Sequence, residues 1–325
     1  MIMVIFNIQD FDITSLVEQY RGKKLEELFR NHQIIKNNQG EFIDITWEED
    51  NFPSDLNLFV TKKKLLHNLK IIHNIGEFNE KKLKGRGIKT LKDFKFLNLR
   101  YRDSANYLLQ LIETKEFNIL KKNRYIDDLD VSFCFKTEEL LFLDIETLGI
   151  YDNAIIILGI GFFKDHKYEV HLFFARDLEE EIAICEHFKN EILPNFKCFV
   201  SYNGKRFDIP YIANRLLYYF DENPMISEYD IPYEITNSKF HHIDLYLICR
   251  RKFRGMFDRF TLTNIEEQLL NWKRKNELPS SMVPVCYKKY QKNPKRYIGL
   301  IKECIEHNYF DVYSMPLILQ KLLEI

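Results

Sequence analysis

The stretch LLFLDIET, residues 140–147, is the starting point for predicting the fold. Its first residues have the compact apolar composition of a buried strand, and the strand ends in two acids, Asp144 and Glu146. Two acids separated by one residue point to the same strand face. Acids on a buried face are costly to leave unpaired, and a divalent cation such as Mg²⁺ or Mn²⁺ is a natural partner. Asp-x-Glu alone occurs by chance in many soluble proteins, so the rest of the chain decides its meaning.

An alternation of strands and helices follows Asp130 and surrounds this stretch. Short apolar or alternating runs predict strands, and longer amphipathic runs predict helices. The expected strands are Leu140–Ile145, Ala154–Phe163, Tyr168–Phe174, Phe196–Tyr202 and Phe240–Leu247, and the expected helices include Leu178–Leu193 and Asp208–Phe220. This order predicts an α/β fold with a mixed five-stranded sheet flanked by helices.

Two further acids stand where the same site would need them. Asp208 lies between an expected strand and an expected helix, where it is also a plausible first residue of that helix. His307 and Asp311 are four residues apart and share a helix face, so the histidine could exchange a proton with a metal-bound water. That spacing is also common among surface pairs.

Taken together, these motifs resemble those of a known enzyme superfamily. Asp-x-Glu on a first strand, Asn203-x-x-x-Phe207-Asp208 at a strand-to-helix turn and His307-x-x-x-Asp311 on a late helix resemble the three motifs of DEDD-superfamily 3′-5′ exonucleases. The resemblance covers roughly residues 138–325, and within the superfamily it is greatest to the YprB-like ribonuclease H-like proteins. The supporting residues are His242-Ile243-Asp244-Leu245, Val283-Pro284, Tyr287 and Tyr290.

The resemblance implies a ribonuclease H-like exonuclease domain over residues 131–325. It makes Asp144, Glu146, Asp208 and Asp311 the ligands of two divalent cations, Mg²⁺ or Mn²⁺, with Asp144 bridging both ions. It also implies that Thr147, Asn203 and Phe207 bind the terminal nucleotide and that His307 is the general base. His307 stands four residues before Asp311, the spacing that the family gives to tyrosine rather than histidine. For Asp244, capping of the following helix is favoured over a role in the site.

The chain before residue 131 divides into two parts. Residues 1–60 form a mixed region with a strand around 41–47, to which no chemical role is assigned. Residues 61–130 are helical and resemble helix-hairpin-helix modules, in which Gly76 would let backbone amides at a helix start bind a nucleic-acid phosphate. A second, poorer hairpin is expected at residues 97–112, with Tyr101-Arg102-Asp103 as its turn. A small helical bundle with solvent-facing lysines is the alternative.

Charge is unevenly distributed although the formal net charge is only -1. Residues 61–124 carry 17 basic and 6 acidic side chains, residues 125–190 carry 5 and 15, and residues 250–296 carry 13 and 4. Two basic blocks that flank a carboxylate-rich centre suit phosphate binding on both sides of it, although such runs are also typical of solvated helix faces. The basic and aromatic segment 250–260 could hold a single strand by phosphate contacts and base stacking.

These observations predict a metal-dependent 3′-5′ exonuclease that hydrolyses single-stranded DNA or RNA. A structure-specific endonuclease on the same fold, or a nucleic-acid-binding scaffold without catalysis, are the alternatives. Residues 1–14 lack the basic region and cleavage site of a secretory signal, and no apolar run reaches the length of a membrane span. The six cysteines form no C-x-x-C pair, so we expect a reduced, cytoplasmic protein with no membrane partner.

Overall fold

The structure is a computed structural model, and it describes residues 13–50, 52, 56–96, 99–150, 152–225, 239–275 and 278–325. Most of the N-terminal stretch considered as a secretory signal, residues 1–12, therefore lies outside the described residues, as does Leu97 of the expected second hairpin.

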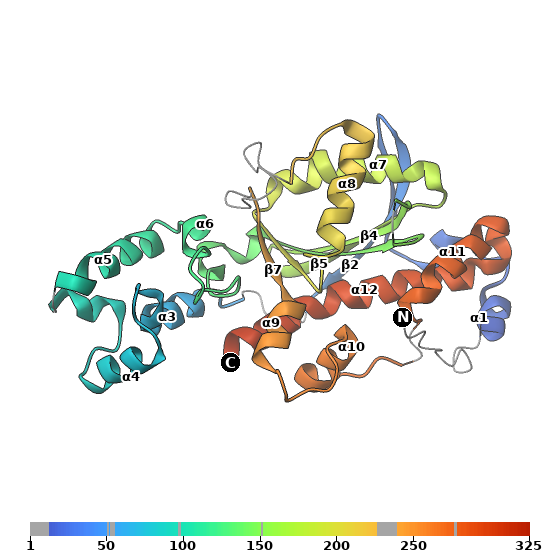
Figure 1. Cartoon of the computed structure of the whole chain (residues 1–325). Coiled ribbons are helices and arrows are strands. Elements are labelled where there is room, and N and C mark those ends of the chain that lie inside the picture. The colour runs from blue at the N-terminus through green and yellow to red at the C-terminus, as the bar shows by residue number, and fades with distance from the viewer. Residues whose placement is uncertain are drawn as a thin grey trace.

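Two strands from the N-terminal part of the chain and five from its middle form one mixed sheet (Figure 1). The strands are β1 His32–Asn37, β2 Gly40–Glu49, β3 Leu140–Thr147, β4 Ile155–Lys164, β5 Lys167–Phe174, β6 Cys198–Ser201 and β7 His241–Asp244. Their order across the sheet is β1-β2-β5-β4-β3-β6-β7. β3 is antiparallel to β4 and parallel to β6, and β6 is parallel to β7. The remaining neighbours are antiparallel.

The predicted α/β class and mixed sheet are confirmed, but the predicted number of strands is wrong. The five expected strands correspond to β3 to β7, and β1 and β2 extend the sheet to seven strands. β2 pairs with β5 from Ile43 opposite Phe174 to Glu49 opposite Tyr168. The strand expected around 41–47 is part of β2. Its partner β5 is distant in the chain, so no local sequence pattern indicates this pairing.

Helices make up most of the remaining described structure. The α-helices are α1 Ile13–Tyr20, α2 Leu25–Leu28, α3 Val60–His67, α4 Glu77–Gly85, α5 Leu99–Glu113, α6 Phe117–Leu120, α7 Glu181–His187, α8 Asp208–Phe220, α9 Leu245–Lys252, α10 Leu262–Ile265, α11 Val283–Lys292 and α12 Pro294–Glu324. Short helical turns of other types are η2 Leu69–Ile71, η3 Leu91–Phe96, η4 Ser132–Cys134, η5 Thr137–Glu139, η6 Leu178–Glu180, η7 Phe188–Ile192, η8 Leu193–Asn195, η9 Glu266–Leu270 and η10 Ser280–Met282. Among the described helices, none combines the length and apolar character needed to cross a membrane.

The two faces of the sheet are covered by different helices. α7 and α8 lie over one face, and α12, with α9 and α11, lies over the other (Figure 1). Along β3, Leu141 and Leu143 belong to the core beneath α7 and α8, whereas Leu140 and Phe142 belong to the core beneath α12. Because side chains alternate along a strand, Asp144 and the other acid of β3 emerge on the α12 side.

Glycines of β4 allow α12 to approach the sheet closely. A Cβ on Gly159 would stand 2.0 Å from Asn308 Oδ1 of α12. A Cβ on Gly161 would stand 2.0 Å from the hydroxyl of Tyr168, which donates to the Val312 carbonyl of α12 at 2.9 Å. Gly159 is also the β4 partner of Asp144, so this close approach places α12 beside the acids of β3.

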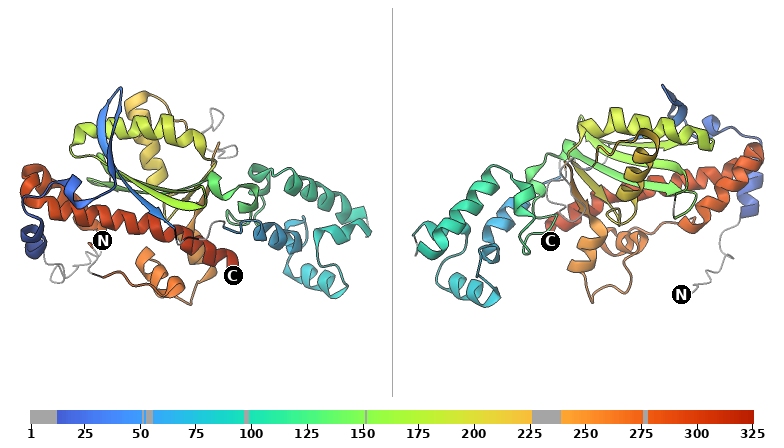
Figure 2. Two further views of the ribbon diagram at one scale, coloured as in Figure 1. Left: turned by 180° about the vertical axis from the view of Figure 1, so that it is seen from behind. Right: turned by 45° about the horizontal axis from the view of Figure 1, so that its top comes forward.

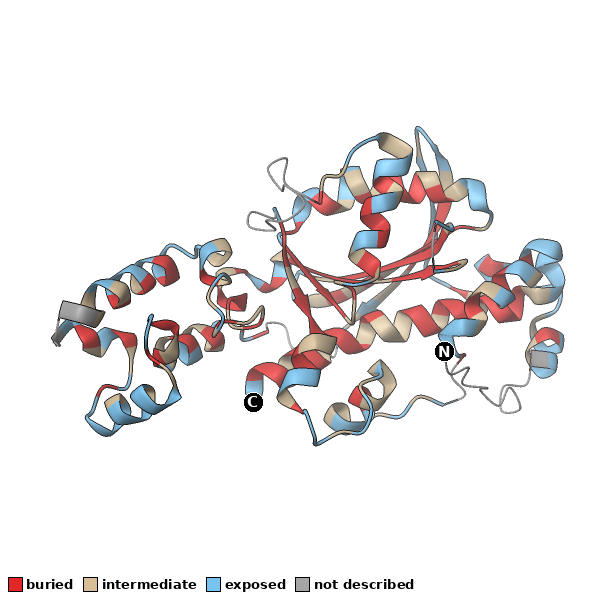
Figure 3. Ribbon diagram, viewed as in Figure 1, coloured by how far each residue is buried: buried red, intermediate tan, exposed pale blue. Residues whose placement is uncertain are grey.

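Helices α3 to α6 pack around a core of their own and project from the end of the sheet where β7 lies (Figures 1 and 2). The buried residues of this core include Leu65 of α3, Leu69 of η2 and Ile72, which follows η2. Figure 3 shows exposed residues along the outer sides of these helices. The expected second hairpin is wrong, because Tyr101-Arg102-Asp103 lies within the continuous helix α5 and forms no turn.

Candidate active site

The first two acids of the site are held by β3. Glu146 is 8% exposed and Asp144 is partly buried, and both lie on the side of the sheet that α12 covers. The pairing of β3 with β4 shifts in register between Glu146 and Thr147, directly after the second acid. The hydroxyl of Thr147 donates to the Gly149 carbonyl at 2.7 Å and thereby closes the turn that follows.

The third acid, Asp208, is the first residue of α8 and is 4% exposed. Its Oδ1 accepts a hydrogen bond from the Ile145 amide at 3.1 Å, which places it directly beside β3. The preceding turn is tight: a Cβ on Gly204 would stand 2.3 Å from Ser201 Oγ and 3.1 Å from Asp208 Oδ2. Asn203, with φ of 68°, is in the left-handed region that asparagine tolerates.

α12 supplies the fourth acid and the histidine. His307 Nε2 lies 3.5 Å from Glu146 Oε1 and 3.6 Å from Asp311 Oδ2. One potential ligand atom from each of these three residues lies within 4.8 Å of the others. The next residue of the helix, Asn308, donates to Asp144 Oδ2 at 2.7 Å. Tyr309 points elsewhere, since its hydroxyl donates to Glu49 Oε1 at 2.5 Å.

Several residues that were not predicted from the sequence also contact the site. Arg274 Nη1 lies 2.6 Å from Asp311 Oδ1, and the same guanidinium pairs with the fully buried Glu266. Ser280 Oγ and His307 Nε2 are hydrogen-bonded at 3.1 Å. Asn308 stands inside the last motif, but its type alone did not distinguish it from a surface residue.

Burial and mutual repulsion raise the pKa values of Asp144, Glu146 and Asp208. Burial raises the pKa of Asp144 well above its usual range, and Asp311, Asp208 and Glu146 raise it further. Burial raises the pKa of Glu146 to about 8 although His307 opposes the rise. Burial likewise raises the pKa of Asp208 to about 7 against the hydrogen bond from the Ile145 amide. These acids therefore repel one another in a poorly solvated place, and a cation between them would relieve the repulsion.

The acids border a pocket of about 350 Å³. Ile150 at its mouth is 69% exposed. The predicted site residues that line the pocket are Asp144, Glu146, Thr147, Asn203, Phe207, Asp208 and Asp311. His307 is 6% exposed and contacts two of the lining acids from behind. Gly76 is not part of this site: it precedes α4 in the helical region.

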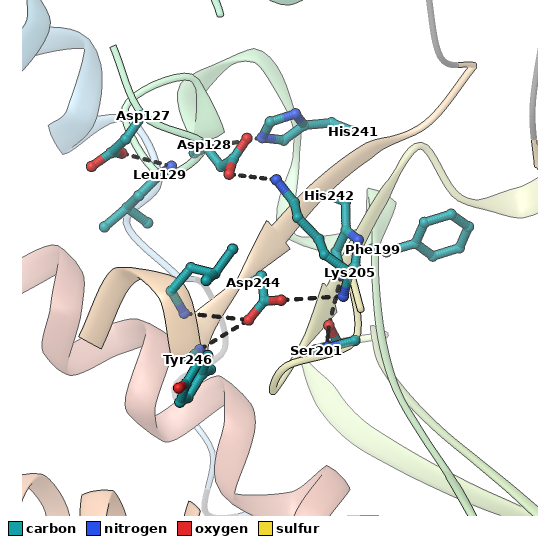
Figure 4. Close-up of polar contacts among 12 residues, drawn as sticks. Asp127, Asp128, Leu129, Phe199, Ser201, Lys205, His241, His242, Asp244 and Tyr246 are labelled. Carbon is teal, nitrogen blue, oxygen red and sulfur yellow. Dashed lines mark hydrogen bonds and ion pairs between the residues drawn. The ribbon is translucent and has the colours of Figure 1, made fainter. Parts of the chain in front are cut away.

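Asp244 holds the loop beside the pocket, as Figure 4 shows. Its carboxylate accepts from the amides of Tyr246 and Leu247 at the start of α9, so the favoured capping role is confirmed. The same carboxylate accepts from the Asn203 and Lys205 amides at 3.0 and 3.1 Å. It therefore fixes the turn that carries Asn203 relative to β7 and α9.

A comparison with known families agrees with this geometry. The model of the RNase_H superfamily matches residues 141–323, more than half of the chain. The chain belongs to the RNase H superfamily. Membership identifies this part as an RNase H-like, nuclease-type domain, which implies a nucleic-acid substrate. All four predicted carboxylates lie within the matched range.

A bacterial protein is similar to part of the chain. The chain is 27% identical over 184 residues to the uncharacterized protein YprB of Bacillus subtilis (strain 168). The match covers 56% of this chain and 41% of that protein. The predicted likeness to YprB is thus confirmed, whereas the exonuclease subtype remains a prediction.

The donor set fits divalent metal ions. The carboxylates of Asp144, Glu146, Asp208 and Asp311 offer oxygen atoms, and carboxylate oxygens are the donors that Mg²⁺ and Mn²⁺ prefer. RNase H-like nucleases usually use divalent metals, and the cluster of Glu146, His307 and Asp311 has the compactness that a metal site requires.

Proposed function

We propose that the protein is a 3′-5′ exonuclease that hydrolyses phosphodiester bonds in single-stranded DNA or RNA with two divalent cations. The observation that carries the proposal is the meeting of four carboxylates from β3, α8 and α12 at one open pocket. A nucleic-acid-binding scaffold would have no use for such a group of acids, because they repel phosphates unless cations compensate them.

Asp144, Glu146, Asp208 and Asp311 would hold the ions. Divalent ions held there would supply a lower pKa for the attacking water and stabilisation for the negative charge of the leaving 3′ oxygen. Asn308 orients Asp144 by donating to its Oδ2, and the Ile145 amide orients Asp208 by donating to its Oδ1. The chain therefore fixes the ligands before substrate arrives.

His307 takes the proton of the attacking water in this proposal. Its Nε2 faces Glu146 and Asp311, and Ser280 keeps a hydrogen bond to the same nitrogen. Burial beside two carboxylates holds the ring in one orientation, which a general base requires. Tyr309, two residues before Asp311, is engaged with Glu49 on β2 instead.

Apolar and aromatic groups at the pocket mouth would contact the terminal nucleotide. Phe207, Tyr202 and the exposed Ile150 line the pocket next to the acids. Bases stack on aromatic side chains without strong sequence preference, so these residues suit a sequence-tolerant exonuclease. Asn203, also in the lining, would hydrogen-bond the sugar or phosphate.

Basic side chains near the pocket would hold the rest of the strand. Arg250, Arg251, Arg254 and Arg259 are exposed on α9 and the segment after it. This segment is tied to the pocket because the hydroxyl of Tyr202 donates to the Phe260 carbonyl at 2.6 Å. Binding through phosphates would make affinity fall steeply with salt.

The test is degradation of 5′-labelled single-stranded DNA and RNA in Mg²⁺ or Mn²⁺, with Asp144→Ala as the inactive variant. We expect ladders of successively shorter products, lost in the variant by a factor of roughly 1,000 or more, because one of the four carboxylates that would hold the ions is missing. Asp165→Asn is the matched control, since Asp165 is exposed in a turn with φ of 48°, which asparagine tolerates.

Each alternative gives a different result. A single internal band that depends on metal would make the protein an endonuclease. Binding of oligonucleotides that is equal with and without Mg²⁺, with no shortening under any metal, would leave only a nucleic-acid-binding scaffold. Equal activity of wild type and Asp144→Ala would show that the reaction takes place elsewhere.

A further inference from the structure

A buried arginine lies against the carboxylate pocket. The Arg274 side chain is 3% exposed, and its Nη1 stands 2.6 Å from Asp311 Oδ1. Arginine keeps its charge at all relevant pH values, so a fixed positive charge stands beside one of the four acids. Any divalent ion bound by Asp311 must share this carboxylate with the guanidinium.

Arg274 is itself held in place. Its Nε donates to Glu266 Oε2 at 2.7 Å and its Nη2 donates to Glu266 Oε1 at 2.5 Å. Glu266 is fully buried, and the guanidinium also lies 5.6 Å from the ring centre of Trp272 and 5.7 Å from that of Phe310. A two-bond pairing with a carboxylate fixes the guanidinium plane. The remaining Nη1 therefore donates to Asp311 from a fixed point.

This contact distinguishes the two oxygens of Asp311. Oδ1 is engaged by Arg274, whereas Oδ2 lies 3.6 Å from His307 Nε2, the atom that also approaches Glu146. We propose that Arg274, anchored by Glu266, is a positioning residue that turns one oxygen of Asp311, Oδ2, toward the divalent ion. The inference rests on the proposed metal centre.

Two possible effects of Arg274 on metal binding have opposite signs. A guanidinium that acts only through its charge repels the ion, and its removal would tighten metal binding. A guanidinium that orients Asp311 supports metal binding, because without it the carboxylate rotates freely. Residues that orient metal ligands typically contribute about 10-fold to 100-fold in affinity. Whether removal of Arg274 tightens or weakens metal binding therefore distinguishes the charge effect from the orienting effect.

The experiment measures Mn²⁺ binding directly, without catalysis. The full chain is titrated with Mn²⁺, and the signal of the free ion is followed by electron paramagnetic resonance. Arg274→Met is compared with the double variant Glu266→Gln/Arg274→Met, which removes both charges and leaves no unpaired buried carboxylate. We expect both to bind Mn²⁺ about 10-fold more weakly than wild type.

Lys273→Met is the matched control. It removes the same charge from the neighbouring position, whose side chain is 79% exposed and pairs with Glu267 rather than with the site. We expect unchanged Mn²⁺ affinity in this variant. Thermal unfolding of every variant verifies that the fold persists, and if Arg274→Met does not fold, the double variant decides.

The outcomes are separable. Weaker binding in the variants with normal binding in the control supports the positioning role. Unchanged or tighter binding in the folded variants overturns it while leaving the metal centre intact. A wild-type chain that binds no Mn²⁺ refutes the metal centre, and with it the function proposed above.

Discussion

Glu146 is surrounded by charge yet poorly solvated. The residue is 8% exposed. Burial raises its pKa, the neighbouring charges of Asp311 and Asp208 raise it further, and His307 opposes the rise. A carboxyl with a pKa of about 8 holds its proton at neutral pH when no metal is bound. Metal binding at this residue therefore releases a proton.

The stability of the metal-free protein should consequently fall as pH rises from 6.5 to 8. The pKa of Glu146 is raised from 4.5 to about 8, so the folded state binds its proton more tightly than the unfolded chain does, and that stabilising contribution is lost through this window. Burial lowers the pKa of His241 from 6.5 to about 4, so this histidine changes the stability only between about pH 4 and 6.5, below that window. In Glu146→Gln the side chain cannot ionise. We therefore expect the fall in Tm between pH 6.5 and 8 to be several degrees smaller than in the wild type.

Thermal unfolding in EDTA measures this effect at several pH values. Glu179→Gln is the control, because Glu179 is exposed on the short turn η6. Addition of Mg²⁺ should stabilise the wild type more at pH 8 than at pH 6.5, since the ion competes with protons. Equal slopes for wild type and Glu146→Gln would mean that Glu146 is already ionised in the metal-free fold.

At the scale of elements, the contact between β4 and α12 sets how closely this helix approaches the sheet. Gly159 leaves room for Asn308, and Asn308 in turn donates to Asp144. In Gly159→Ala the new Cβ would meet Asn308 Oδ1 at 2.0 Å and side chains of Leu172 and Val312 at 2.9 Å. We expect a loss of about 2 kcal/mol in the free energy of unfolding, because overpacking forces the helix away.

Chemical denaturation measures that loss, and nuclease assays should show a parallel fall in activity because Asn308 no longer orients Asp144. Gly85→Ala is the matched control: Gly85 ends α4, and a Cβ there meets nothing within 4 Å. A Gly159→Ala protein as stable as the wild type would mean that α12 adjusts freely, and that its glycine contact does not position the site.

Local patterns predicted the elements that carry the acids. The apolar strand before Asp144 and the strand-to-helix turn before Asp208 are continuous in sequence, and both match β3 and α8. The pairing of β2 with β5 joins distant segments and had no local signal. Arg274 could not be found either, since its meeting with Asp311 depends on how the turn η9 directs the following chain, with Asn271 at a φ of 53°.

At the scale of the whole molecule, the helical region is tied to the loop beside the pocket. Lys205 Nζ donates to Asp128 Oδ2 at 2.6 Å, and the His241 ring bonds the Asp128 carbonyl at 2.8 Å (Figure 4). Arg251 of α9 pairs with Asp127 at 3.3 Å. These contacts hold the segment that follows α6 against β7, α9 and the loop of Lys205, so a bound strand could continue from the basic surface of α9 toward the helical region.

The surface of α4 offers the groups that a single strand needs. Lys81 and Lys82 are exposed, and Phe78 in the first turn is 79% exposed. Solvated lysines bind phosphates, and an exposed ring gives bases a stacking surface. Gly76 directly precedes α4, so the backbone amides at the start of this helix could bind a phosphate. Phosphate binding there remains a prediction.

We therefore expect Lys81→Glu/Lys82→Glu to weaken binding of a long single-stranded oligonucleotide without changing hydrolysis of a very short one, which reaches only the pocket. Each lost phosphate contact flattens the dependence of log affinity on log salt by about 0.7 for a single strand, so two lost contacts flatten it by about 1.4.

Fluorescence anisotropy across a salt series, in the Asp144→Ala background, measures this slope. Lys164→Glu, at the exposed end of β4, is the control for a lysine-to-glutamate exchange away from α4. If the α4 variant keeps both the affinity and the salt slope of its parent, the helices serve as a structural bundle, and the strand is held by the pocket and α9 alone.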